Sequence, residues 1–234
     1  MVNTHEQSPK EKLIQALSSG IYKHRFLLIG LFVFMVVFFI VFGVYSELQK
    51  SRSQEAAEHI EAVNEQFITW IDTTDEDEKT AIAEEIFEST ESILETYPNT
   101  FAAQKAMFIQ ANLDFNQENY EEAITGFTQL IDRYPETYLA PIAQFNIAAA
   151  YENLEEADNA IAAFESLLAD FPQAVAQNTR ALMNVGRLHE SQEEWEEAEI
   201  AYTRLIDGYP ESHWTNIAEN RIIYLTVSGY IDQE

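Results

Sequence analysis

Hydrophobic and polar residues follow a helical rhythm along most of this chain, with one exception near the start. From residue 26 to 45 the sequence reads FLLIGLFVFMVVFFIVFGVY, twenty residues without a charge. As a helix this stretch would rise about 30 Å, which matches the hydrocarbon core of a bilayer. Residues 26–45 are therefore predicted to form a transmembrane helix. A buried core helix is one alternative, although such helices rarely stay apolar on every face. A cleaved signal peptide is the other, although its apolar stretch is shorter.

The charges beside this span predict its orientation. Four cations precede it and only two follow closely: Lys10, Lys12, Lys23 and Arg25 before, Lys50 and Arg52 behind. The positive-inside rule places the richer side in the cytoplasm. We therefore expect residues 1–25 to be a cytoplasmic tail and everything after residue 45 to lie outside the cytoplasm.

After the span, a short sequence motif recurs at a nearly constant spacing. Four prolines each follow an aromatic residue and stand 37, 37 and 38 residues apart: Pro98, Pro135, Pro172 and Pro210. Two amphipathic stretches with apolar residues at helical spacing lie between consecutive prolines, and no stretch alternates like a strand. Such a period is typical of stacked helical hairpins. The chain is therefore predicted to be all-α.

Each second helix of these hairpins has the same internal spacing. A small residue is followed four positions later by an aromatic residue and eight positions after that by the proline, as in Ala123/Phe127/Pro135, Ala160/Phe164/Pro172 and Ala198/Tyr202/Pro210. The small residue lets two helices approach closely, the aromatic ring fills the gap, and the proline ends the helix. This pattern resembles the tetratricopeptide repeat. The resemblance implies a right-handed solenoid with repeats at about 102–135, 139–172 and 177–210, although the first helices match it less well.

The segments around the three repeats complete the predicted organisation. Residues 46–75 form a linking amphipathic helix, and residues 76–234 form the solenoid, with a degenerate leading second helix and a C-terminal capping helix. In the leading helix Ile86 and Thr90 stand where Ala and an aromatic residue belong. Because the period exceeds the usual 34 residues by about one helical turn, we expect long first helices.

The linking helix carries an apolar seam with alternating spacings of four and three, formed by Ala56, Ile60, Val63, Phe67 and Trp70. We expect this seam to pack on the first repeat helices. Self-association along it is the alternative, although two heptads make a marginal coiled coil.

Composition narrows the range of functions. The chain has 13 basic and 40 acidic residues, a net charge of −27, and would repel a nucleic-acid backbone. It has no cysteine, so no disulfide, thiolate metal site or lipid attached through Cys is expected. Its five histidines are scattered, and it has no glycine-rich phosphate loop and no nucleophile elbow. We therefore predict that it is not an enzyme and uses no cofactor and no metal.

The repeat resemblance implies a concave surface, lined by first helices, that binds polypeptide. The groove-facing positions carried over from the repeat are Phe108, Asn112, Phe145, Ala149, Arg180 and Arg187. Core packing is the alternative for the two aromatics, and pairing with glutamates such as Glu190 is the alternative for the arginines. The Lys and Arg clamp that some such domains use for a C-terminal carboxylate is not reproduced. An extended or exposed apolar polypeptide is the expected guest.

The whole layout is similar to that of the membrane-anchored ancillary Sec translocon subunit family of bacteria. That resemblance implies a single-pass inner-membrane protein with a periplasmic repeat domain, acting as an adaptor or chaperone-like subunit on exported polypeptides beside the translocon and periplasmic chaperones. The alternative is a structural scaffold that docks one fixed cell-envelope assembly or division partner. The partner and the oligomeric state are left open by the sequence.

Overall fold

The computed structural model describes residue 10, residue 22 and residues 24–232, and within them every regular element is an α-helix. This confirms the all-α prediction. Most of the predicted tail at 1–25 lies outside the described residues. The chain divides into two compact units, residues 1–54 and residues 55–234.

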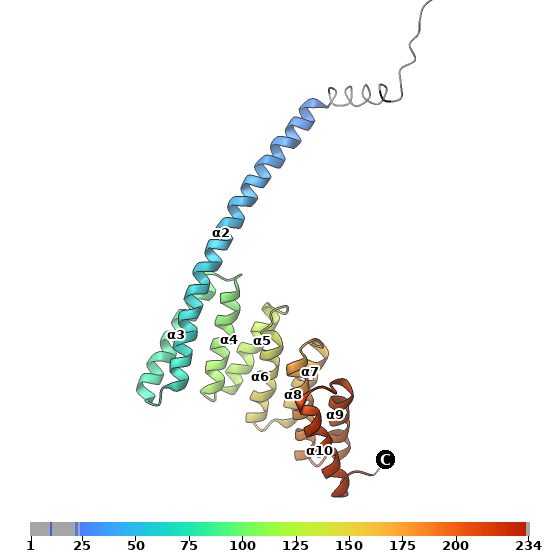
Figure 1. Cartoon of the computed structure of the whole chain (residues 1–234). Helices are drawn as coiled ribbons and strands as arrows, with labels where there is room; N and C mark the ends of the chain where they lie inside the picture. Colours follow the sequence, from blue (N-terminus) through green and yellow to red (C-terminus); the bar gives the residue numbers. More distant parts are fainter. Residues whose placement is uncertain (1–9, 11–21, 23, 233–234) are drawn as a thin grey trace, which may run out of the picture. The chain divides into compact units, whose positions relative to one another are not determined.

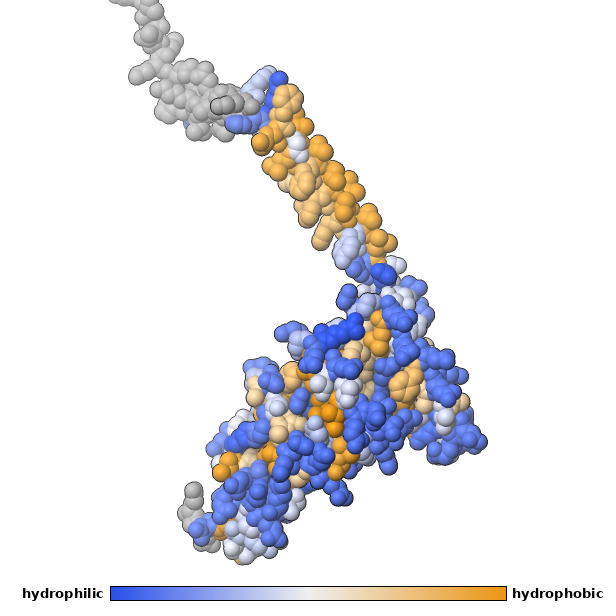
Figure 2. Space-filling view, turned by 180° about the vertical axis from the view of Figure 1, so that it is seen from behind, coloured by the Kyte–Doolittle hydropathy of each residue, from blue (hydrophilic) through white to orange (hydrophobic). Residues whose placement is uncertain are grey.

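The first described helix is α2 (Arg25–Asp72), 48 residues long. It contains both the predicted span and the predicted linking segment without a break. Large apolar side chains in its first half are exposed, Phe26 and Phe39 among them, and Figure 2 shows a hydrophobic surface over this part of the helix. By length and composition, α2 is the one helix among the described residues that could cross a membrane.

The unit at 55–234 begins with a hairpin made by the end of α2 and α3 (Glu76–Thr96). The seam of α2 is buried in a hydrophobic cluster with α3 and α4 (Phe101–Asn116); Ala56, Ile60, Val63 and Trp70 are each at most 4% exposed. The prediction that the seam packs on the repeat helices is confirmed, since the chain itself covers the apolar face that self-association would need.

Helix α3 covers the segment where the sequence predicts a degenerate second helix. The Asp75 carboxylate caps it by accepting a bond from the Glu78 N–H at 3.0 Å. Ile86 and Thr90 are fully buried. The Thr90 hydroxyl donates to the Ile86 carbonyl at 2.7 Å and accepts from the Gln110 amide of α4 at 2.7 Å, so the polar group is satisfied where an aromatic ring would otherwise pack.

Three further hairpins follow. They pair α4 with α5 (Tyr120–Arg133), α6 (Ala140–Asn153) with α7 (Ala157–Asp170), and α8 (Val175–Ser191) with α9 (Trp195–Gly208). The closing helix is α10 (His213–Val227). Figure 1 shows α3 to α10 stacked in chain order. The aromatic of each second helix is fully buried, as the spacing predicts: Phe127, Phe164 and Tyr202.

First-helix length follows the expectation only in part. Helices α4 and α8 have 16 and 17 residues, but α6 has 14, the same as α5, α7 and α9. The expectation is wrong for α6 because Pro141 lies in its first turn, where a missing N–H is tolerated, and the extra residues before it form a turn instead.

Each of the three hairpins from α4 to α9 turns through a residue with left-handed backbone. Glu118, Glu155 and Glu193 have φ of 64°, 61° and 62° at the same place in successive hairpins. The next residue's N–H then bonds back to a carbonyl of the first helix, as from Asn119 to Asp114 at 2.9 Å. Glycine is the usual residue at such a position, so these glutamates are held there by the surrounding hairpin.

Candidate protein-interaction surface

The first helices α4, α6 and α8 carry all six residues that the sequence assigns to a groove, and we call their shared surface the first-helix face. Its two aromatics point into the interior. Phe145 is 8% exposed, with its ring 5.2 Å from that of Phe164, and Phe108 lies half-buried 5.7 Å from Phe127. Both rings therefore pack in the core, Phe145 almost completely and Phe108 in part.

Arg180 lies over one of these rings. Its guanidinium carbon is 4.3 Å from the centroid of the Phe145 ring, and the residue is exposed. A cation over an aromatic face is attracted by the ring quadrupole. The contact fixes the direction of the Arg180 side chain while its N–H donors stay in solvent.

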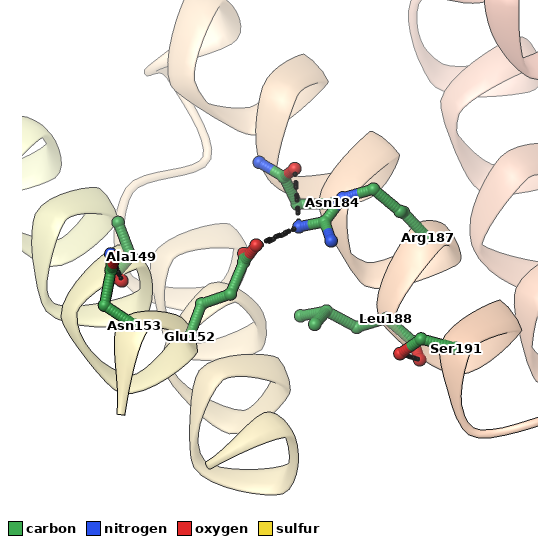
Figure 3. A network of polar contacts seen from close by, with 7 residues as sticks. All are labelled: Ala149, Glu152, Asn153, Asn184, Arg187, Leu188 and Ser191. Carbon is green, nitrogen blue, oxygen red and sulfur yellow. Dashed lines mark hydrogen bonds and ion pairs between the residues drawn. The ribbon is translucent and has the colours of Figure 1, made fainter. Parts of the chain in front are cut away.

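Arg187 joins two hairpins. It donates from Nη2 to both carboxylate oxygens of Glu152 in α6 at 2.6 Å and to the side-chain oxygen Oδ1 of Asn184 at 3.3 Å. Figure 3 shows these contacts. The same view shows Asn153 bonded to the carbonyl of Ala149 one turn earlier. The sequence suggests Glu190 as a partner for the arginines of this face. For Arg187 that prediction is wrong, because Arg187 pairs with Glu152 and Glu190 bonds to other residues.

Glu190 is instead the centre of a network that joins α8, α9 and α10. The Tyr202 hydroxyl donates to it at 2.5 Å, and Arg221 donates from Nε at 2.9 Å and also from Nη2. Burial raises the pKa of Glu190, but the bonds from Arg221 and Tyr202 outweigh it and lower the pKa below the usual range. Burial, followed by the bond to Glu190, raises the pKa of Tyr202. The pair stays as carboxylate and neutral phenol across physiological pH.

A row of asparagines crosses the first-helix face, and sequence reasoning found only its first member. Asn112, Asn146 and Asn184 lie half-buried on α4, α6 and α8. The Asn146 amide nitrogen is 3.3 Å from the Asn112 side-chain oxygen, and Asn112 donates to the Phe108 carbonyl at 2.7 Å. The spacing of 38 residues between Asn146 and Asn184, equal to one repeat, was the signal that could have revealed them.

Clefts in the repeat unit also occur where second helices meet. One, of about 450 Å³, lies between α3, α4 and α5 and has Phe87, Leu94 and Met107 beside Asp114, Glu121 and Glu122. Burial, and then the neighbouring Glu122, raises the pKa of Asp114 to about 6. The other, of about 720 Å³, lies between α7, α8 and α9. Among residues 10, 22 and 24–232, no three His, Asp or Glu side chains are arranged to hold a metal ion.

Comparisons with known proteins identify the repeat. Residues 23–226 match the tetratricopeptide repeat-like domain family. A tetratricopeptide repeat protein from Parabacteroides merdae has a similar structure, with 17% identity and a TM-score of 0.50 over 69% of this chain and 58% of that one. The first TPR of Spaghetti (RPAP3), bound to the HSP90 peptide SRMEEVD, shares 23% identity with a TM-score of 0.42, over 55% of this chain and 94% of that one.

A comparison with curated proteins gave no match. The family match covers most of the chain and agrees with the buried small and aromatic residues of its hairpins. Repeats of this kind are typically modules for protein interaction. The chain belongs to the tetratricopeptide repeat-like domain family.

Proposed function

We propose that this protein is a membrane-anchored adaptor whose first-helix face binds extended segments of exported polypeptides at the inner-membrane translocon. The observation that carries the proposal is the asparagine row beside Arg180. An asparagine side chain offers both a donor and an acceptor, which are the groups that the main chain of an extended polypeptide needs. Such a row binds many sequences, because it reads the backbone rather than particular side chains.

The charge distribution supports polypeptide as the ligand. Residues 55–234 contain seven basic and 37 acidic residues. A surface this acidic repels nucleic acid and anionic partners and favours segments that carry Lys or Arg. Because Arg187 is neutralised by Glu152, Arg180 is the cation of this face best placed to meet a carboxylate of the bound chain.

The anchor rests on the apolar half of α2. A helix of twenty uncharged residues spans the hydrocarbon core, and the excess of cations before it favours a cytoplasmic N-terminus. In spheroplasts, protease added outside should digest the repeat unit and spare the tail. Protection of the repeat unit in intact spheroplasts would overturn this orientation and the export role with it.

Photo-crosslinking in cells tests the binding role. A crosslinking amino acid placed at Asn146 or Asn184 of the full-length protein should capture exported polypeptides of many sizes. The matched control is Thr128, exposed on α5 away from the first-helix face. One product of fixed size would instead favour a scaffold that docks a single envelope partner. Equal capture from Thr128 and Asn146 would refute binding at this face.

A further inference from the structure

The closing helix α10 has an uncovered apolar face. Ile223, Tyr224 and Val227 are 59%, 50% and 79% exposed, and Tyr230 just beyond is 42% exposed. The residues after α10 turn back on the last hairpin, since Ile231 is buried and the Tyr230 ring stacks on Trp195 at 4.2 Å. An exposed apolar face of this kind is typical of an interaction site.

The repeat pattern shows what this face corresponds to. The buried residues Thr215, Ala218 and Leu225 of α10 stand 37 positions after the buried residues Asn178, Ala181 and Leu188 of α8. Ile223 therefore occupies the place of Gly186. On α8 that place is covered by Tyr202 of the following helix, whose ring lies so close that a Cβ at Gly186 would be 2.3 Å from it.

Ile223 on the exposed face of α10 thus stands where a following helix packs in the preceding hairpin, whereas Tyr224 corresponds to Arg187, which is exposed on α8. The isoleucine is too bulky for a helix packed as closely as α9 is on α8, but its side chain provides apolar surface for a helix at wider spacing. The structure therefore indicates a helix as the occupant.

The charge around α10 indicates which helix binds to it. Residues 212–230 contain one acidic and one basic residue, Glu219 and Arg221, in a unit whose remaining surface is strongly acidic. A basic partner would gain more from the acidic faces than from this neutral one. Two copies of this chain repel each other over most of their surface, but not at α10.

We propose that α10 binds α10 of a second copy around a two-fold axis. A two-fold interface places the same patch on both sides, so the patch must be complementary to itself. A neutral apolar face meets this condition because it brings no like charges together. The aromatic side chains are partly fixed in advance. Arg221 is bonded to Glu190 and lies over the Tyr224 ring at 4.8 Å, and Tyr224 is 6.4 Å from Tyr230. Fixed aromatic side chains lose little conformational entropy on binding.

The absence of cysteine makes the test direct, because a single introduced thiol has no competitor. Val227→Cys in the full-length protein, oxidised in native membranes, should give a disulfide-linked dimer. Thr128→Cys, also exposed but on α5, is the matched control and should stay largely monomeric. Adding Ile223→Glu to the Val227→Cys protein should abolish the dimer band. Far-UV circular dichroism checks that this variant stays folded, as its exposed position predicts.

Light scattering of the detergent-solubilised full-length protein gives an independent readout. The unmodified chain should have the mass of a dimer, and Val227→Glu the mass of a monomer, whether or not Ile223→Glu folds. A monomeric unmodified chain, a dimer that survives Val227→Glu, or a Val227→Cys adduct to a different protein would each overturn the proposal. None of these results depends on what the first-helix face binds, so the two proposals can fail separately.

Discussion

Gly186 of α8 and Tyr202 of α9 lie close together in the third hairpin. A Cβ added at Gly186 would lie 2.3, 2.6 and 2.7 Å from three atoms of the Tyr202 ring. The ring is fully buried, and its hydroxyl is bonded to Glu190 at 2.5 Å, with Glu190 in turn bonded to Arg221. The ring therefore cannot tilt away without breaking a partly buried polar network.

Two opposing effects set the expected result of Gly186→Ala. Overpacking of a close-packed core by one methyl group costs about 1–3 kcal/mol, and the upper end applies because the clash is with an anchored ring. Replacing glycine by alanine inside a helix returns about 1 kcal/mol. The net loss of stability is about 2 kcal/mol, which corresponds to a melting temperature lower by roughly 4–8 °C for a domain of this size.

Thermal unfolding of the full-length protein in detergent, followed by circular dichroism, measures this change. Gly208→Ala is the matched control, because a Cβ there meets nothing within 4 Å and should leave stability equal or slightly higher. Adding Tyr202→Phe to the Gly186→Ala protein frees the ring from Glu190 and should recover part of the lost stability. The double variant has the alanine and phenylalanine pair of the two preceding hairpins. A Gly186→Ala protein as stable as the unmodified chain would refute the packing argument.

Three other substitutions test separate parts of the fold. Phe164→Ala, at a fully buried ring of the central hairpin, should lower the free energy of unfolding by about 3–5 kcal/mol in denaturant titration; an unchanged midpoint would mean that the ring is not part of the core. Glu155→Gly should raise it by about 0.5–1 kcal/mol, because φ is 61° and glycine adopts this conformation without strain, and a loss would show that the glutamate is required. Asp114 has a folded-state pKa of about 6, so it binds protons more tightly in the folded chain, and its contribution to stability decreases as pH rises from about 4 to 6. Asp114→Asn should therefore stabilise the protein at pH 7, by up to about 1 kcal/mol after allowance for solvent screening, and have no such effect at pH 4; equal effects at both pH values would contradict the assignment.

The sequence predicts the hairpins well because their information is local. A small residue, an aromatic one turn later and a proline after the helix determine where second helices pack and end, and three copies in phase remove ambiguity. The seam of α2 was equally readable, since its burial follows from apolar spacing alone. The length of α6 could not be predicted in this way, because the position of Pro141 and the turn before it decide where that helix begins.

The first-helix face is harder to predict because its contacts join different repeats. Arg187 bonds to Glu152, 35 residues earlier, rather than to Glu190, three residues later. The stacking of successive hairpins brings α6 and α8 together. A helical wheel of one helix cannot show a contact between two helices. In the same way, Phe145 of α6 lies in the core, and Arg180 of the next first helix lies over its ring. The spacing of residues within one helix therefore gives the core, but not the partners on the surface.

The third hairpin differs from the other two in how it contacts the helix that follows it. Where they have alanine and phenylalanine, it has Gly186 and Tyr202, and the smaller residue makes room for the hydroxylated ring. That hydroxyl reaches Glu190, which holds Arg221 of the closing helix. A pair that only packs in the earlier hairpins thus also joins α8 and α9 to α10. The arginine it fixes lies over Tyr224 on the exposed face of α10. The same interactions that close the core therefore also position an aromatic ring on the exposed face of α10, where we propose that a second copy binds.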